Sequence, residues 1–366
     1  MKLSYGRTLF FVQSVVGSMR LTRQRNLALL ALGIARVRDG HLTMSEIARV
    51  IPRPYDHWYK FKRIKRFLAN PRWFPDAHFD ELVAFVTTRF RTGRYLPIII
   101  DQSTIRGRWE VVWASVPFRG RALPIAFRLF RYADVADSPQ GSQNTLEETF
   151  VRQVVRSLPD GVEPLLLFDR GYARVSLFRL LDQMDVRYVV RVKKDVWVAR
   201  DSQYQGLLGN VPVPTGALLC WSGVAYHLTH RYRVKLAITR DARAEEPWYL
   251  VTNLPRASSA VRWYERRFRC EELFRDLKDQ LHLETIRLQH PDRVARLLFG
   301  MIILYYALTL LGAEAHRRGL RKKVCKDRIS LVWLALRILA MPLLLRDTLV
   351  HAALHPSSWL LLYESG

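Results

Sequence analysis

Two short apolar segments, each ending at an aspartate, constrain most strongly what this chain can fold into. The first, YLPIIID, covers residues 95–101, and the second, PLLLFD, covers residues 164–169. Each is too short for a typical helix and has the composition of a buried strand. An amphipathic helical pattern, NTLEETFVRQVVRSL at 144–158, lies between them. Buried strands that alternate with amphipathic helices predict a mixed α/β sheet with helices packed on it.

The same alternation continues through the middle of the chain. Further strands are expected at 110–118, 123–130, 187–194 and 248–255, and a further helix at 176–184. Residues 195–247 break the pattern with short candidate strands between Gly, Pro and charged residues. We therefore expect a core over residues 93–315 that a β-rich insertion at 195–247 interrupts.

The first 92 residues are expected to form a helical region that the core does not need in order to fold. Thr43, followed three residues later by Glu46, makes a capping box at one helix start. The helix after it carries five basic residues: Lys60, Lys62, Arg63, Lys65 and Arg66. A helix, a turn and a basic helix suggest a DNA reader of the helix-turn-helix kind. The alternative is an ordinary bundle with a basic solvated face.

The net charge restricts the class of partner. The chain has 366 residues, of which 49% are hydrophobic, so it is long and apolar enough to fold. Its 58 Lys+Arg and 33 Asp+Glu leave a formal charge of +25. Such an excess favours a polyanion, with nucleic acid first and an anionic membrane surface second. The three cysteines are too few and too scattered for a disulfide framework or a thiolate zinc site, which fits a reducing compartment.

One apolar stretch, residues 297–313, is long enough to be considered as a membrane span. Its 17 residues include two tyrosines and a threonine and reach only the lower limit for spanning, so we favour a buried helix. The N-terminus lacks a convincing signal peptide. Residues 316–366 are expected to form a helical region that packs on the core or, as a dimerisation element, on a second subunit.

The charged segment YERRFRCEELFRDLK, residues 264–278, has the spacing of a helix with two stripes. At about 100° per residue, four polar residues lie within an arc of roughly 60°. These are Tyr264, Arg267, Glu271 and Lys278. A neighbouring apolar stripe contains Trp263, Cys270, Phe274, Leu277 and Leu281. Glu272 turns about 100° away, and Asp276 is expected to face solvent. The alternative is an ordinary surface helix with i,i+4 ion pairs.

Three carboxylates in these segments suggest a metal site. Asp101 and Asp169 each end a buried strand, where an open α/β sheet binds its ligands, and Glu271 belongs to the polar stripe. Carboxylates that converge repel one another unless a cation joins them, and oxygen ligands suit Mg²⁺. A pair of such ions can activate an attacking oxygen and stabilise a leaving one during phosphoryl transfer. The stripe's Arg and Lys would then hold phosphates.

The spacing of the polar stripe matches a known motif. Tyr264, Arg267, Glu271 and Lys278 are separated by two, three and six residues, as in the Tyr-Arg-Glu-Lys motif of the insertion-sequence-four family of DNA transposases. Together with the two aspartates, the chain resembles a DDE transposase with a ribonuclease-H-like core, from about residue 95 to 315. The resemblance implies cut-and-paste transposition by a homodimer that pairs two inverted-repeat ends, cleaves them through hairpins and joins them to target DNA.

The resemblance also implies residue roles. Asp101, Asp169 and Glu271 would bind Mg²⁺, or Mn²⁺ in its place, two ions to a site. The DNA backbone near the cleaved phosphate would be contacted by a basic and aromatic set: Tyr264, Arg267, Lys278, Arg275 and Arg170. Trp248 would receive a base flipped from the hairpin, although a strand tryptophan that fills the core is the alternative.

Three alternatives to transposition remain open on the sequence alone. A related metal-dependent nuclease, or an inactive DNA-binding descendant, would share the same pattern, although the intact triad argues against an inactive form. A membrane protein with a span at 297–313 is the alternative of another class. With double-stranded DNA as the main partner and no membrane, we expect a cytoplasmic, nucleoid-associated protein.

Overall fold

The computed structural model describes most of the chain. The described residues are 11–37, 41–51, 55–89, 93–135, 137, 141–242, 246–325, 329–341 and 344. The proline-marked turn at 52–54 and the end of the C-terminal region, 345–366, lie outside them.

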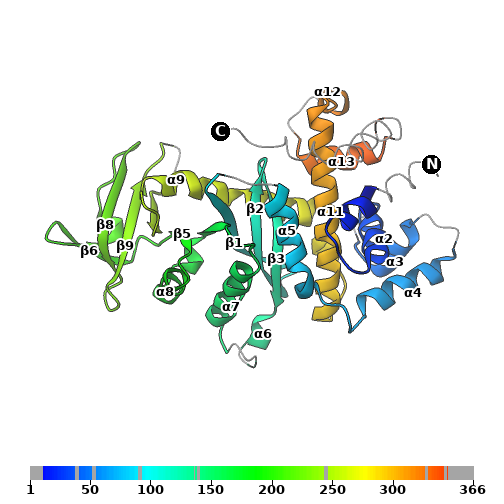
Figure 1. Cartoon of the computed structure of the whole chain (residues 1–366), viewed down its shortest axis with the longest axis horizontal. Coiled ribbons are helices and arrows are strands. Elements are labelled where there is room, and N and C mark those ends of the chain that lie inside the picture. Colours follow the sequence, from blue (N-terminus) through cyan, green and yellow to red (C-terminus); the bar gives the residue numbers. More distant parts are fainter. Residues whose placement is uncertain are drawn as a thin grey trace.

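Ten strands form one continuous sheet in this part of the chain (Figure 1). They are β1 (Tyr95–Ile105), β2 (Trp109–Phe118), β3 (Arg121–Phe130), β4 (Glu163–Phe168), β5 (Arg187–Arg191), β6 (Trp197–Arg200), β7 (Tyr204–Leu207), β8 (Leu218–Tyr226), β9 (Tyr232–Thr239) and β10 (Trp248–Thr252). Their order across the sheet is β3-β2-β1-β4-β5-β10-β9-β8-β6-β7. The expected mixed α/β sheet is confirmed.

The first half of the sheet contains both kinds of pairing. Strands β1, β2 and β3 are antiparallel neighbours, whereas β4 runs parallel to β1 and β5 parallel to β4. The parallel pairs need crossover connections, which α7 (Gln143–Arg156) and α8 (Val175–Gln183) provide. This is the arrangement expected of a ribonuclease-H-like core.

Strands β6–β9 lie within residues 195–247, the segment expected to be a β-rich insertion. They do not form a separate sheet, because β10 pairs with both β5 of the core and β9 of the insertion. In Figure 1 they extend the sheet to one end of the molecule. Backbone hydrogen bonds therefore connect the insertion, through β10 and β5, to β4, the strand that precedes Asp169.

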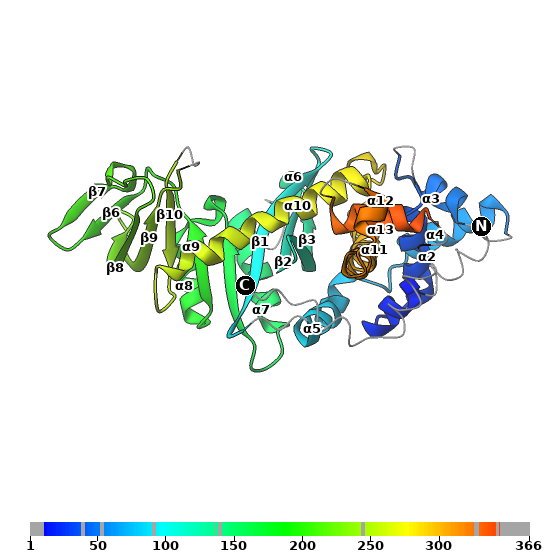
Figure 2. The same cartoon turned by 90° about the horizontal axis from the view of Figure 1, so that it is seen from above.

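Helices cover both faces of the core sheet. Figure 2 shows α10 (Arg269–Arg275) crossing one face, with α5 (Phe79–Arg89), α7 and α8 on the other. Every residue of β2 is buried as a result. This explains its near-continuous apolar sequence, since a strand covered on both sides does not alternate.

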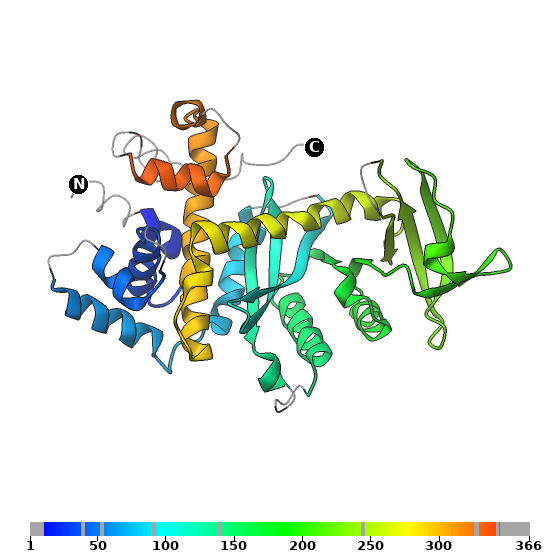
Figure 3. The ribbon, with the colours of Figure 1, turned by 180° about the vertical axis from the view of Figure 1, so that it is seen from behind.

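The apolar stretch 297–313 lies inside α11 (Pro291–Arg317), the longest described helix. By length and composition α11 could cross a membrane, but 94% of its most apolar window is buried by the rest of the protein. Figure 3 shows it between the sheet and the N-terminal helices. Its position is that of a core helix, as the sequence favoured.

The N-terminal helices pack directly on α11. Besides a helical segment at 11–18, they are α2 (Gln24–Ile34), α3 (Met44–Val50) and α4 (His57–Leu68). Gly300 of α11 lies so close to Leu30 of α2 that a Cβ there would meet the Leu30 side chain at 2.5 Å. Arg296, also on α11 and 2% exposed, donates hydrogen bonds to the carbonyls of Leu68 and Trp73, at 3.1 and 2.8 Å.

These contacts argue against the expectation that the core folds without residues 1–92. Arg296 places a positive charge at the C-terminal end of α4, where helix carbonyls lack partners. Removing residues 1–92 would expose one side of α11 and leave Arg296 without its acceptors. The N-terminal region is thus part of the same hydrophobic core as the sheet, and we expect its removal to destabilise the core.

The described part of the C-terminal region is helical, as expected. It contains α12 (Arg321–Val324) and α13 (Leu331–Leu339). Helix α13 packs on α11 at Gly312, whose missing side chain leaves room for the Leu331 backbone. This part packs on the core, and its role in dimerisation stays a prediction.

Candidate active site

Strand register places Asp101 beside Asp169. In the parallel pair of β1 and β4, Ile100 lies opposite Phe168, and each aspartate is the next residue. The sequence suggested that Asp101 ends its strand, but β1 continues to Ile105 by pairing with β2, where Asp101 lies opposite Trp113. The two aspartates therefore meet at the point where β4 ends and one edge of β1 becomes free.

Glu271 comes from the segment that crosses the sheet. This segment is not one regular helix but a succession of α9 (Ser259–Tyr264), the 3₁₀ turn η4 (Glu265–Phe268), α10 and the π-helical turn η5 (Asp276–Gln280). The phase of about 100° per residue therefore holds only locally. The i,i+4 contact from Arg267 to Glu271 is preserved, at 3.0 Å.

Arg267 joins two of the three carboxylates. Its Nη1 donates to Asp101 Oδ2 at 2.7 Å, and its Nη2 donates to Glu271 Oε1 at 3.0 Å. The Arg267 side chain is 7% exposed, and Asp101 13%, while Glu271 is 54% exposed. Burial opposes the charge of Arg267, but Tyr264 and Asp101 outweigh it, so the pKa of Arg267 is raised and the guanidinium stays charged. It occupies the position of a cation shared by two carboxylates.

Asp101 has further donors around it. The backbone amide of Gln102 donates to its Oδ1 at 2.8 Å, and the Cys270 thiol donates to its Oδ2 at 2.7 Å. Burial raises the pKa of Asp101, and Arg267 offsets part of that rise. Burial is the main cause that raises the pKa of the Cys270 thiol, and the negative charge of the nearby Asp101 raises it further. The sequence placed Cys270 on the apolar stripe, which is correct, but gave no sign of its contact with Asp101.

The three carboxylates are ligands of the kind that a hard divalent cation binds, but they are not close enough together in this structure to hold one ion. Within the described ranges, no three His, Cys, Asp or Glu side chains are grouped closely enough to hold a metal ion. The three acids nevertheless converge, since Asp101 and Asp169 are neighbours by register and Glu271 reaches Asp101 through one guanidinium. Mg²⁺ and Mn²⁺ prefer carboxylate oxygens as ligands. Between Asp101 and Glu271, the guanidinium of Arg267 supplies the positive charge.

An aromatic cluster supports Arg267 from behind. Tyr264 is 1% exposed, and its ring lies 5.7 Å from Cζ of Arg267. The ring of Trp248 stacks on Phe268 at 5.5 Å and meets Tyr264 edge-on at 5.2 Å. The burial of Tyr264 argues against the predicted contact with a DNA backbone, and the ring packs against Arg267 instead. Trp248 is only partly buried.

The remaining basic residues predicted near the site lie around it. Lys278, in η5, pairs with Glu284 at 3.2 Å and makes no described contact with the three acids. Arg275 is 63% exposed and pairs with Glu272 at 2.7 Å. Arg170, directly after Asp169, is exposed. The structure thus brings Arg267 into contact with the acids and leaves the other three at the surface.

Glu272 and Asp276 belong to a different cluster. Arg121 of β3 contacts Glu272 Oε2 through Nη1 at 2.6 Å and lies 2.9 Å from Asp276 Oδ2 through Nε, although Nε is not aligned as a hydrogen bond. Glu272 therefore faces away from Asp101, as expected. Asp276 was expected to face solvent but is 3% exposed. The hydroxyls of Tyr305 and Ser330 lie 3.5 and 3.4 Å from it, so α11 and the start of α13 cover it.

A polar network next to Asp101, centred on the buried Glu147, was not predicted from the sequence. Glu147 of α7 accepts hydrogen bonds from Arg174 and Gln143, each at 2.8 Å, and Gln143 also donates to Gln102. Burial raises the pKa of Glu147, and Arg174 partly offsets this. The buried Tyr172 hydroxyl has no partner among the described residues. No local signal marks Glu147, because Arg174 is 27 positions away.

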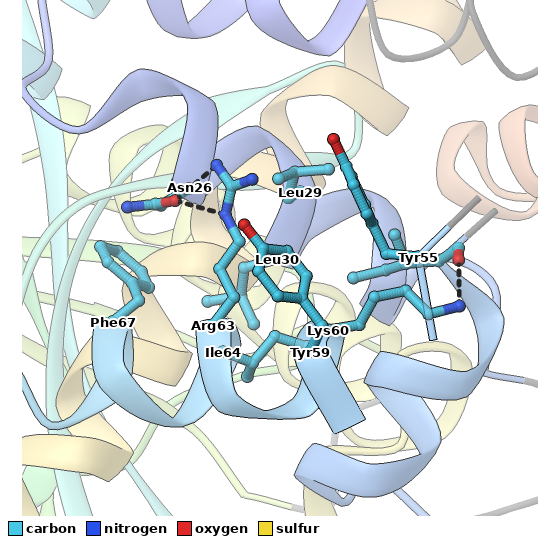
Figure 4. A pocket seen from close by; sticks show the side chains of 10 residues that line it. Asn26, Leu29, Leu30, Tyr55, Tyr59, Lys60, Arg63, Ile64 and Phe67 are labelled. Carbon is cyan, nitrogen blue, oxygen red and sulfur yellow. Dashed lines mark hydrogen bonds between the residues drawn. The ribbon is translucent and has the colours of Figure 1, made fainter. Parts of the chain in front are cut away.

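The five basic residues predicted on one helix all lie on α4 but face two ways. Lys60 donates to the Ile51 carbonyl at 3.0 Å, and Arg63 donates to Asn26 at 3.0–3.1 Å. Figure 4 shows both at an apolar pocket between α2 and α4, which Tyr55 and Tyr59 also line. Lys62, Lys65 and Arg66 are exposed. The pocket lies among the N-terminal helices, away from the acids.

Comparison with known proteins assigns the core. A family model described as a transposase DDE domain matches residues 93–307, more than half of the chain. The match begins before β1 and ends within α11, so it contains Asp101, Asp169 and Glu271. No curated protein matches the chain. The sheet order, the converging acids and this match agree, and the chain belongs to the family of transposases with a DDE domain.

Proposed function

We propose that this transposase belongs to the insertion-sequence-four group and moves its element by a cut-and-paste route. In this proposal a homodimer pairs two inverted-repeat ends, nicks them, releases them as hairpins and joins them to target DNA. The protein would work in the cytoplasm, associated with the nucleoid. The main support is the register that sets Asp101 beside Asp169, with Glu271 tied to Asp101 through Arg267.

DDE transposases generally use divalent metals. We assign Asp101, Asp169 and Glu271 as ligands of a pair of Mg²⁺ ions, with Mn²⁺ as a substitute. Bound there, the metal would supply activation of the attacking oxygen and stabilisation of the leaving one. Arg170, Arg275 and Lys278 are assigned to the DNA backbone, because a charged group near the scissile phosphate positions it. Tyr264 is assigned to orient Arg267.

The direct test is cleavage of DNA that carries the element's own ends. With Mg²⁺, the full-length protein should nick the ends and produce hairpins that a denaturing gel resolves. The control substrate has the same length but carries scrambled repeats in place of those ends. Nicking without hairpins or joining would favour a related nuclease over the cut-and-paste route.

Helix α4 is proposed to read the ends, because Lys62 and Lys65 are exposed while its buried face is held by α2 and α11. The double variant Lys62→Ala/Lys65→Ala should weaken binding to end DNA more than binding to random DNA. Its log–log salt slope should fall by roughly 0.9 for each phosphate that the variant no longer neutralises. Fluorescence anisotropy at several salt concentrations measures both quantities.

A matched control is Lys322→Ala/Lys323→Ala, which removes two exposed lysines from α12. It makes the same change in net charge at the other end of α11. Equal loss of end preference in both double variants would show that α4 contributes only charge.

Trp248 is proposed to stack on a flipped base during hairpin formation. Stacking on an aromatic ring is worth about 1–3 kcal/mol, so Trp248→Ala should slow hairpin closure by roughly 5- to 150-fold. First nicking should keep its rate, because the acids are unchanged. Quenched-flow gels follow the two steps, and 2-aminopurine at the terminal bases reports unstacking.

Trp221→Ala, in the insertion, is the control, since Trp221 is also partly buried but lies on β8. If Trp248→Ala slows nicking and closure equally, Trp248 serves the packing of Tyr264 and Phe268 alone.

A further inference from the structure

The position of Arg267 raises a question about the proposed metal site. Its guanidinium contacts Asp101 Oδ2 at 2.7 Å and Glu271 Oε1 at 3.0 Å, and both residues are assigned above as metal ligands. One side chain therefore binds an oxygen from each of two acids on different elements, β1 and α10. Such charge-assisted hydrogen bonds are short and directional.

Asp101 offers no oxygen that is free of a donor. Its Oδ2 accepts from both Arg267 and Cys270, and its Oδ1 accepts from the Gln102 amide. The amide is part of the strand backbone, and the Cys270 thiol lies in the core, 0% exposed. Arg267 is the only one of these three donors on a long, jointed side chain. It is therefore the donor that can leave.

Aromatic rings pack against Arg267, but they do not accept a hydrogen bond from its Nε. The rings of Phe268 and Tyr264 lie 4.8 and 5.7 Å from its Cζ. Its Nε is buried and has no hydrogen-bond partner among the described residues. A buried donor without a partner is costly. The two acids thus carry most of what fixes the guanidinium at this position.

We propose that Arg267 is a counter-ion that competes with the divalent metal for Asp101 and Glu271, and that metal binding frees it for a DNA phosphate. A divalent metal held by Asp101 would lie close to the guanidinium, and two positive charges at short range repel each other strongly. Freed from the acids, the guanidinium fork fits a phosphate. Metal binding and the contact of Arg267 with DNA are thereby coupled. This inference rests on the metal site of the proposed function.

The test is Mn²⁺ binding by the full-length protein without DNA, followed from the electron paramagnetic resonance signal of free Mn²⁺. Arg267→Gln should bind Mn²⁺ about tenfold more tightly than the unaltered protein, because a positive charge next to the ion is removed. Arg262→Gln is the matched control, since Arg262 is exposed on α9 and the net charge changes equally. It should leave Mn²⁺ affinity unchanged.

The direction of the change decides the result. If Arg267 only holds the acids in position, Arg267→Gln leaves Mn²⁺ affinity unchanged or weakens it, and the inference is overturned. Circular dichroism checks that the variant folds. If it does not, Arg267→Lys is read instead: a lysine contacts one acid at a time, so a smaller gain supports competition and no gain, or a loss, rejects it.

Asp101→Asn separates this inference from the proposed function. If the unaltered protein binds Mn²⁺ and Asp101→Asn abolishes that binding, the metal site stands whatever Arg267→Gln shows. If binding does not depend on Asp101, the metal site itself fails, and the competition fails with it.

Discussion

Asp101→Asn, Asp169→Asn and Glu271→Gln should each lower the rate of end cleavage by at least about a thousandfold, because each removes a charged oxygen that holds metal at the reacting phosphate. Each substitution keeps the size and shape of the side chain. Binding of end DNA should change much less, since the basic groups proposed to contact DNA, apart from Arg267, lie on α4, around η5 and at Arg170. Cleavage gels with Mg²⁺ measure the first quantity, and anisotropy measures the second.

Glu272→Gln is the neighbour control on the same helix. Glu272 pairs with Arg121 and Arg275 and not with Arg267, so its loss should reduce stability rather than remove cleavage. A Glu272→Gln protein that is folded but as inactive as Glu271→Gln would contradict the assignment of Glu271. Near-normal cleavage by any one of the three variants would remove that residue from the metal site.

Asp276→Ala should lower the free energy of unfolding by about 1–3 kcal/mol, because it leaves the largely buried Arg121 and the hydroxyls packed on Asp276 with one partner fewer. Arg121, only 14% exposed, would keep Glu272 as its remaining partner, which places the effect at the lower end of such losses. Asp276 also connects η5 to Tyr305 of α11 and to Ser330. Denaturant unfolding measures the change.

The pH dependence tests the same carboxyl. Burial, partly opposed by Arg121, raises the pKa of Asp276 to about 6 from its ordinary value of 3.8. The folded protein thus keeps this proton longer than the unfolded chain does, so the contribution to stability is complete below about pH 4 and is lost as the pH rises through about 6. Asp276→Asn cannot titrate. The stability of the unaltered protein relative to Asp276→Asn should therefore fall between pH 4 and 7, and a constant difference would show that Asp276 has an ordinary pKa.

The sequence was sufficient where the relevant interactions are local. The apolar runs before Asp101 and Asp169 predicted two buried strands, and parallel pairing then set the acids side by side. The i,i+4 ion pair between Arg267 and Glu271, which the alternative of an ordinary surface helix included, is present in the structure. Both relations depend on backbone periods that a sequence displays directly.

Other features depend on distant partners and could not be predicted in this way. Asp276 looked like a solvent residue on a regular helix, yet β3 and α11 bury it, and η4 and η5 change the helical phase. The contact of Cys270 with Asp101 joins residues 169 positions apart. The apolar character of α11 indicated burial but did not show that one of its sides is covered by the N-terminal helices.

The packing of α11 has a consequence for exchanging parts between related transposases. Gly300 leaves room for the Leu30 side chain, and Arg296 donates a hydrogen bond to the Leu68 carbonyl at the C-terminal end of α4. The N-terminal helices and α11 therefore have complementary surfaces. A chimaera that grafts the N-terminal helices of another transposase onto this core would meet a foreign α11. To retarget this protein to new DNA ends, the graft should carry the matching face of α11 as well, or alter only the exposed residues of α4.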